Sequence, residues 1–219
     1  MTSVLADLAL ESEAATALAM RLAGAADRAA RGDAGEAAML RLALPAAKYW
    51  VCKRTPAAVG EALECLGGNG YVEESGMPRL YRDAPLNSIW EGSGNVTVLD
   101  VLRALARAPG AADALLAEID LAAGGDRRLD TAAARLRDEL KEADSAGAQY
   151  RARRLAGQIA VTMQAALLVR HAPAAVADAF CASRIGPEFA GGPGGPFGSL
   201  PDGLDLDPVL DRARAGIRG

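Results

Sequence analysis

The chain has few aromatic residues, which make up 4% of its 219 residues, and few segments in which β-branched and polar residues alternate. Strands are rich in β-branched and aromatic residues, so this shortage disfavours a β fold. Alanine, the best intrinsic helix former, is abundant, and 51% of the residues are hydrophobic. The composition therefore predicts an all-α protein that can bury one or two cores.

Histidine and cysteine are also scarce. The three cysteines, Cys52, Cys65 and Cys181, are far apart in the sequence. They form neither a CxxC motif nor an even-numbered disulfide set, so we predict buried free thiols, a reducing compartment and no metal site. The single histidine, His171, stands at an expected helix end before Pro173, where we expect it to interact with the helix dipole and not to act in catalysis.

The sequence also lacks a long apolar run and a strong charge imbalance. The longest apolar run, residues 159–169, contains Thr162 and Gln164 and is too short to cross a bilayer. Residues 1–10 carry one acid, Asp7, and lack the basic start of a signal peptide. The net charge is −4, and no charged tail suggests a nucleic-acid partner. These features predict a soluble, cytoplasmic protein with no membrane contact.

Helical patterns run along most of the chain and are interrupted at Pro109-Gly110. Before this pair, helices are predicted over residues 3–31, 37–66, 85–90 and 95–107. After it, they are predicted over residues 111–121, 131–142, 146–170 and 173–184, and from residue 207 onward. Pro45 and Pro56 are expected to kink the second helix or to mark helix starts, and Asn95 to cap the fourth. Residues 186–203 are too rich in Gly and Pro for regular structure.

A glycine-rich segment follows the second predicted helix. Gly67, Gly68 and Gly70 occupy three of four successive positions. Without a Cβ atom, such residues let a backbone turn tightly and come close to a partner, for example the phosphate or sugar of a cofactor. The ordinary alternative is a helix C-cap and turn.

A single acid stands at the break between two helical patterns. Glu91 follows Ile89-Trp90 and precedes Gly92-Ser93-Gly94. Burial beside the two apolar side chains would raise the pKa of the carboxyl group, which suits a general base. The alternative is a solvated loop residue.

These two segments lie within residues 64–95, which resemble the C-terminal helical domain of the acyl-CoA dehydrogenase family. Residues 71–76, 81–95 and 169–173, with Ala179-Phe180-Cys181, further resemble the DNA-alkylation-response (AidB-type) branch of that family. The resemblance covers nearly the whole chain.

The resemblance implies a helical bundle followed by an extra helical domain. Residues 1–109 would be the acyl-CoA dehydrogenase C-terminal helical domain, and residues 110–219 the additional helical domain. Family members also carry, before this region, an amino-terminal helical domain and a β-barrel that holds the flavin ring. The chain has neither, so we expect either a fragment or split gene product, or a chain whose missing half is supplied by another polypeptide.

The resemblance also implies a cofactor site and a reaction. The glycine-rich segment with Gly67, Gly68 and Gly70 would approach FAD bound mainly by the neighbouring subunit of a homo-oligomer. Ser93 and Asn95 would supply polar contacts to FAD. Glu91 would be the catalytic base, which removes the α-proton of an acyl-CoA substrate while hydride passes from the β-carbon to FAD.

Two further positions bear on this resemblance. Glu64 stands where many family members have a Gln that contacts FAD, and an acid there would face a phosphate-bearing ligand. Arg82-Asp83 matches an Arg-Asp pair of the family, and we expect a local ion pair there that fixes the loop. The alternative is a contact with the substrate.

Residues 127–154 carry eight basic residues against five acidic ones. The resemblance associates the extra domain with double-stranded DNA, and Arg151, Arg153 and Arg154 are the candidate phosphate contacts. Such binding would be independent of sequence and sensitive to salt. The alternative is a solvated helix face with pairs such as Arg135 and Glu139. Three hypotheses thus remain open: a dehydrogenase part, a DNA-binding module with vestigial dehydrogenase activity, and a helical oligomerisation module.

Overall fold

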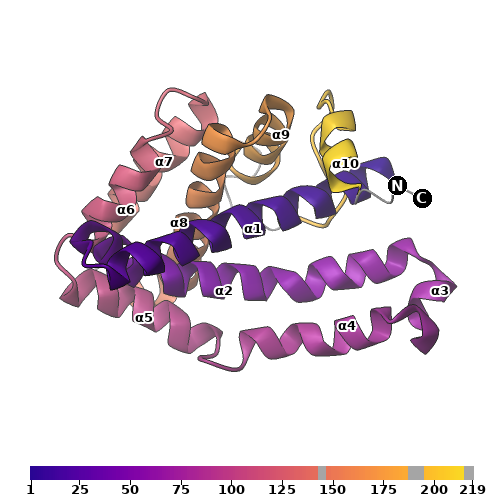
Figure 1. Ribbon diagram of the computed structural model, residues 1–219, viewed down its shortest axis with the longest axis horizontal. Coiled ribbons are helices and arrows are strands. Elements are labelled where there is room, and N and C mark those ends of the chain that lie inside the picture. Colours follow the sequence, from indigo (N-terminus) through magenta and orange to yellow (C-terminus); the bar gives the residue numbers. More distant parts are fainter. Residues whose placement is uncertain (143–146, 187–194, 215–219) are drawn as a thin grey trace.

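The computed structural model describes residues 1–142, 147–186 and 195–214, and all regular structure in these ranges is helical (Figure 1). The prediction of an all-α fold is confirmed. Three sequence predictions fall outside these ranges at least in part: Asp144 in the basic segment, the start of a helix at residue 146, and the irregular segment over residues 186–203. No helix in the described ranges is long and apolar enough to span a membrane.

Two long helices form the frame of the molecule. α1 (Thr2–Ala30) and α2 (Ala34–Cys65) pack side by side along their length. Between them, Asp33 caps α2 by accepting a hydrogen bond from the Glu36 backbone N–H at 3.0 Å. Pro45 and Pro56 both lie inside α2. The predicted alternative that they mark helix starts is therefore wrong. Contacts of α2 with α1 and with later helices along its length outweigh the loss of one backbone donor at each proline.

Short elements line one side of α2. The glycine-rich segment forms α3 (Gly68–Tyr71), and η1 (Glu73–Ser75), α4 (Met77–Asp83) and η2 (Ala84–Ser88) follow. α5 (Gly94–Arg107) then packs against α2. The sequence predicted neither α3 nor α4, because helices of four and seven residues are not stable alone and form here by docking on α2.

The second half of the chain adds α6 (Ala111–Asp120), α7 (Arg127–Lys141), α8 (Ala148–His171), α9 (Ala174–Arg184) and α10 (Asp207–Ala213). α8 is buried over most of its circumference and packs against α1, α2 and α5. Gly157 of α8 faces the Trp50 ring of α2, which a Cβ at this position would contact at 3.4 Å. The Trp50 indole N–H donates to Gln164 Oε1 at 3.1 Å inside this contact.

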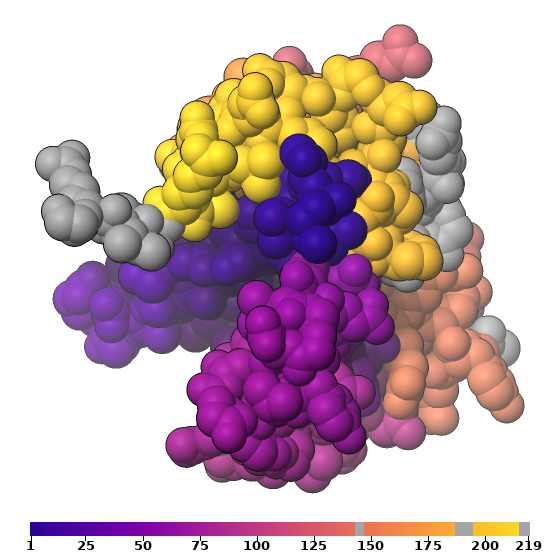
Figure 2. Space-filling view, turned by 90° about the vertical axis from the view of Figure 1, so that its right-hand side faces the viewer, coloured from indigo at the N-terminus to yellow at the C-terminus, as the bar shows by residue number. Residues whose placement is uncertain are grey.

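Helices from both halves share one hydrophobic core, which runs from Ala6 to Val209. The boundary near Pro109 stays a prediction. The carboxyl-terminal segment returns to the start of α1, where the Ser3 hydroxyl donates to the Gly198 carbonyl at 2.8 Å and the Gly198 N–H donates to Asp7 at 2.9 Å. Figure 2 shows the indigo start of α1 next to this yellow segment, with the magenta end of α2 to α4 below.

Candidate functional site

The turn between η2 and α5, residues 90–93, contains an unusual backbone conformation and is called here the Glu91 turn. Glu91 has φ 52°, the only positive φ of a non-glycine residue in the described ranges. A non-glycine residue in this left-handed region costs on the order of 1–2 kcal/mol and persists only where the surroundings enforce it. Such outliers cluster at active sites and ligand contacts.

Lys48 of α2 holds this turn from both sides of Glu91. Its ammonium group donates to the Trp90 carbonyl at 3.0 Å and also to the Gly92 carbonyl. Lys48 is not among the residues predicted from the sequence. It could have been found from its place between Ala46-Ala47 and Tyr49-Trp50, because a lone lysine in an apolar stretch needs hydrogen-bond acceptors.

The prediction that Glu91 is buried beside its apolar neighbours is wrong for this chain. Ile89 is 62% exposed, Trp90 is 56% exposed, and the Glu91 side chain is exposed as well. η2 leaves these side chains on the surface, and no described residue covers them.

An apolar groove between α1 and α2 reaches the residue that holds the turn. The groove has a volume of about 350 Å³. Its lining includes Leu18, Leu22, Leu40, Leu44, Lys48 and Cys52. Burial raises the pKa of the Cys52 thiol, and the nearby Lys48 charge opposes this shift only in part. Cys52 and Cys65 are half-buried and Cys181 is buried, so only Cys181 fully meets the prediction of buried thiols.

The three glycines proposed to approach FAD have different surroundings. Gly67, with φ +58°, and Gly68 are exposed, and a Cβ at either would meet no atom within 4 Å. Gly70 is buried, and a Cβ there would lie 2.1 Å from the Leu63 carbonyl oxygen. Gly70 is therefore needed for packing against the end of α2, whereas the backbone at Gly67 and Gly68 is open to a partner.

The structure does not bring the glycine segment and the Glu91 turn together. Lys48 lies in the middle of α2, and the glycine segment follows its last residue, Cys65. At the rise of an α-helix this separation is about 25 Å. Within one chain, the glycine segment and the Glu91 turn are therefore two separate candidate regions.

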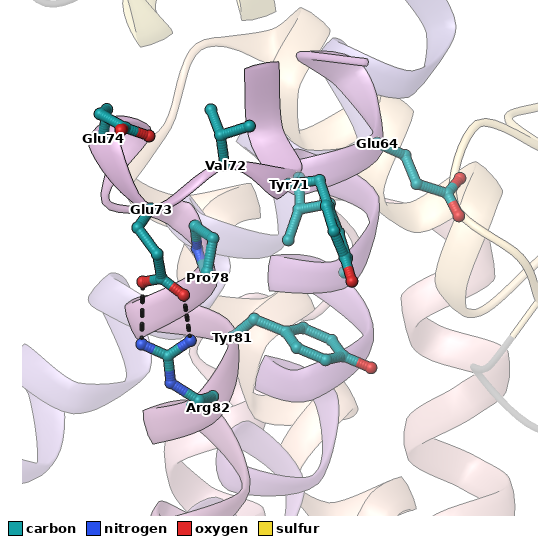
Figure 3. A pocket seen from close by; sticks show the side chains of 10 residues that line it. Glu64, Tyr71, Val72, Glu73, Glu74, Pro78, Tyr81 and Arg82 are labelled. Carbon is teal, nitrogen blue, oxygen red and sulfur yellow. Dashed lines mark hydrogen bonds and ion pairs between the residues drawn. The ribbon is translucent and has the colours of Figure 1, made fainter. Parts of the chain in front are cut away.

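A hollow of about 680 Å³ lies beside the glycine segment, between the end of α2 and α4. Figure 3 shows Glu73 and Arg82 facing each other on one side and Glu64 on the other. Arg82 binds Glu73 through two bonds, at 2.9 Å and 3.1 Å, and the hydrogen bond from Arg82 holds the pKa of Glu73 below its ordinary value. The local ion pair of Arg82 is therefore with Glu73, whereas Asp83 lies 3.8 Å from Arg79.

The two polar candidates at the start of α5 also differ. Ser93 is the N-cap residue of α5, and its exposed hydroxyl makes no hydrogen bond within the described chain. Asn95 is not the cap, which corrects the prediction. It lies inside the first turn, and its Oδ1 atom accepts from Arg153 Nε at 3.1 Å and Nη2 at 2.7 Å.

The basic candidates for nucleic acid are engaged within the chain. Arg151 donates to the Glu142 carbonyl at 3.2 Å, Arg153 binds Asn95, and Arg154 forms an ion pair with Glu139 at 3.0 Å. The predicted pair of Arg135 with Glu139 does not form, because Arg154 of α8 binds that carboxylate.

Arg127 and Arg135 differ from these residues. Neither has an ion-pair partner among the described residues, and both line a hollow of about 180 Å³ on α7.

Comparison with known proteins places residues 1–106 in a family. They match the family described as "Acyl-CoA dehydrogenase, C-terminal domain". These residues therefore belong to the acyl-CoA dehydrogenase family.

The similarity to individual relatives extends beyond that domain. The chain is 45% identical over 181 residues to the putative acyl-CoA dehydrogenase AidB of Escherichia coli (strain K12), which covers 83% of this chain and 32% of AidB. It is 42% identical over 105 residues to acyl-CoA dehydrogenase family member 11 of Caenorhabditis elegans, over 47% of this chain and 17% of that protein. Crystalline Caenorhabditis elegans ACDH-11 in complex with C11-CoA superposes with a TM-score of 0.72 at 28% identity, over 80% of this chain and 34% of that chain. The chain thus spans about a third of the length of AidB and of ACDH-11.

Proposed function

We propose that this chain supplies the carboxyl-terminal wall of a flavin-dependent acyl-CoA dehydrogenase site, with Glu91 as the catalytic base. The observation that carries the proposal is the left-handed backbone of Glu91, which the half-buried Lys48 holds in place. The exposed Glu91 side chain has no packing role that would explain this strained conformation. The Glu91 carboxylate would take the α-proton of an acyl thioester as the β-carbon loses hydride. Exposure of Glu91, Ile89 and Trp90 leaves this side of the site open to a covering domain.

The apolar groove between α1 and α2 supports an acyl substrate. Its leucine side chains offer a surface for a hydrocarbon chain, and Lys48 links the groove to the Glu91 turn. The related ACDH-11 structure contains C11-CoA, an acyl-CoA ligand of that protein.

The residues present fit FAD in part. Gly67 and Gly68 offer open backbone, and the free hydroxyl of Ser93 lies at the amino terminus of α5, where backbone N–H groups favour a phosphate. Asn95 has its amide oxygen bound to Arg153 and offers only its NH₂ group. Gly70 is committed to packing, and the exposed Glu64 disfavours a nearby phosphate. When bound, FAD would supply the hydride acceptor.

The separation of about 25 Å along α2 supports a homo-oligomer in which the glycine segment and Glu91 serve different active sites. Exposed apolar side chains on α3, α4, η2 and α5 and in the turns next to them support a covering partner. They are Tyr71, Val72, Leu80, Tyr81, Leu86, Ile89, Trp90, Val96 and Leu99.

A reconstitution experiment tests the proposal. The chain alone is expected to retain no FAD, because few of its described residues are open to the cofactor. Mixed with the flavin-binding domains that the family resemblance implies, it should restore reduction of FAD by an acyl-CoA. A mixture in which the domains reduce FAD equally fast with and without this chain would overturn the proposal.

A further inference from the structure

Lys48 makes an unusual set of contacts for a lysine on a half-buried helix face. Its ammonium group has no carboxylate partner among the described residues and instead donates to two backbone carbonyls, those of Trp90 and Gly92. These carbonyls belong to the residues immediately before and after Glu91. The Lys48 side chain therefore spans the one non-glycine residue of positive φ in the described ranges.

Two carbonyl bonds on either side of one residue restrict its backbone dihedrals. Rotation of Glu91 to a right-handed or extended conformation would swing at least one carbonyl away from the ammonium group, so each bond opposes relaxation. A charged donor makes stronger hydrogen bonds than a neutral one. The two Lys48 bonds therefore favour the left-handed conformation of Glu91 over its relaxed alternatives.

A separate contact lies at the start of α5, after the Glu91 turn, and does not involve the two carbonyls that Lys48 binds. A Cβ at Gly94 would lie 2.8 Å from Lys53 Cε and 3.6 Å from the Tyr49 ring, so these side chains pack directly on the start of α5. Lys53 makes this contact through its aliphatic stem and forms no hydrogen bond to the Glu91 turn. Lys53 is therefore a matched control for the charge of Lys48 on the same helix.

We propose that Lys48 is a positioning residue that sets the direction of the Glu91 carboxylate for proton abstraction, acting through the backbone and without touching the substrate's reacting atoms. This inference rests on the proposed function of Glu91. The geometry of the hydrogen bonds, by contrast, can be measured in this chain without a cofactor.

The first experiment is lysine-selective ¹⁵N NMR of the chain, which has only three lysines, Lys48, Lys53 and Lys141. The ammonium protons of Lys48 are expected to exchange slowly with water, because two of them are hydrogen-bonded at a half-buried site. Those of exposed Lys53 and Lys141 are expected to exchange fast. Equally fast exchange at all three would overturn the proposal, and this test needs no variant that must fold.

The second experiment measures hydrogen exchange of the backbone amides over residues 89–96. Lys48→Met keeps the stem and removes the donors, so these amides should exchange at least about 10-fold faster, in line with the loss of a hydrogen bond of about 1.5 kcal/mol. Lys53→Met should leave them unchanged, and Lys48→Arg should restore part of the protection. Equal exchange in Lys48→Met and the parent chain would contradict the proposal.

The third experiment uses the chain reconstituted with flavin-binding domains. Lys48→Met should slow flavin reduction at saturating acyl-CoA by roughly 10²-fold, the scale expected for a misplaced catalytic group. Lys48→Arg should recover part of the rate. If Glu91→Gln has no effect on flavin reduction, the proposed function fails, whatever the exchange data show. If Glu91→Gln slows the reaction and Lys48→Met does not, only the role of Lys48 is refuted.

Discussion

Arg153 of α8 donates two hydrogen bonds to the Asn95 side chain of α5, at 3.1 Å and 2.7 Å. The sequence assigned these residues to different ligands, Asn95 to FAD and Arg153 to DNA. In the folded chain they bind each other, and the second half of the chain thereby contacts the first turn of α5, next to the Glu91 turn.

The Arg153–Asn95 contact has a measurable effect on stability. Arg153→Leu should lower the free energy of unfolding by about 1 kcal/mol, since the contact is exposed and its hydrogen bonds compete with water. Arg127→Leu, at an arginine with no ion-pair partner in the described ranges, should change it by less than about 0.5 kcal/mol. Urea unfolding measures both, and equal effects would show that the contact contributes nothing.

A buried ion cluster joins α9 to α1. Arg184, whose side chain is 7% exposed, binds Asp7 and lies 3.2 Å from Glu11. Arg184→Met would leave Asp7 buried without a counter-charge, which should lower the free energy of unfolding by about 3–5 kcal/mol. Arg212→Met removes the exposed pair with Glu13 and should cost at most about 1 kcal/mol. Thermal unfolding of the two variants distinguishes these outcomes, and a smaller loss for Arg184→Met than for Arg212→Met would contradict the account.

Acid should destabilise the chain through Glu118. Burial raises the pKa of this carboxyl, but hydrogen bonds and charges from Arg21 and Arg170 outweigh burial and hold the pKa below its ordinary value of 4.5. Because the folded pKa is lowered, the stabilisation is complete above about pH 4.5 and is lost as pH falls through the folded value. Glu118→Gln should be less stable at neutral pH and should lose less stability on acidification, as followed by urea unfolding at each pH. If the stability of Glu118→Gln falls with acid as steeply as that of the parent, this assignment is contradicted. Glu74→Gln, at an exposed position, is the control.

Any affinity of the chain for duplex DNA should be weak and should fall steeply with salt, with a log–log slope of roughly −2 to −3 for two or three phosphates. The triple change of Arg151, Arg153 and Arg154 to Ala is expected to weaken binding. Unchanged binding in that variant would refute the assignment of these three residues. The double change of Arg127 and Arg135 to Ala tests whether the hollow on α7 contributes instead.

The long helices were predictable because local signals mark their ends. Gly32-Asp33 separates α1 from α2, and Pro109-Gly110 precedes α6, so the predicted bounds lie within a few residues of the observed ones, except at the start of α7. There Asp126 caps α7, whose first residue is Arg127, whereas the predicted helix begins at residue 131.

The surroundings of the candidate residues were not predictable in the same way. The sequence shows that Ile89 and Trp90 precede Glu91, but whether these side chains are buried depends on elements elsewhere in the fold. The partner of Asn95 lies 58 residues away on α8, and the acceptors of Lys48 lie 42 and 44 residues away. No local pattern encodes contacts at such separation, whereas the identity of Glu91 as the acid at a helix break is local and was visible in the sequence.

The most direct test of the central claim is single-turnover flavin reduction by acyl-CoA in the chain reconstituted with flavin-binding domains, with Glu91→Gln compared with the parent. The Gln side chain keeps the size of Glu but cannot accept a proton. The account predicts that reduction slows by roughly 10² to 10⁴ while acyl-CoA still binds, and that Glu74→Gln, at an exposed acid outside the Glu91 turn, has no effect. Reduction by Glu91→Gln at the rate of the parent would contradict the account.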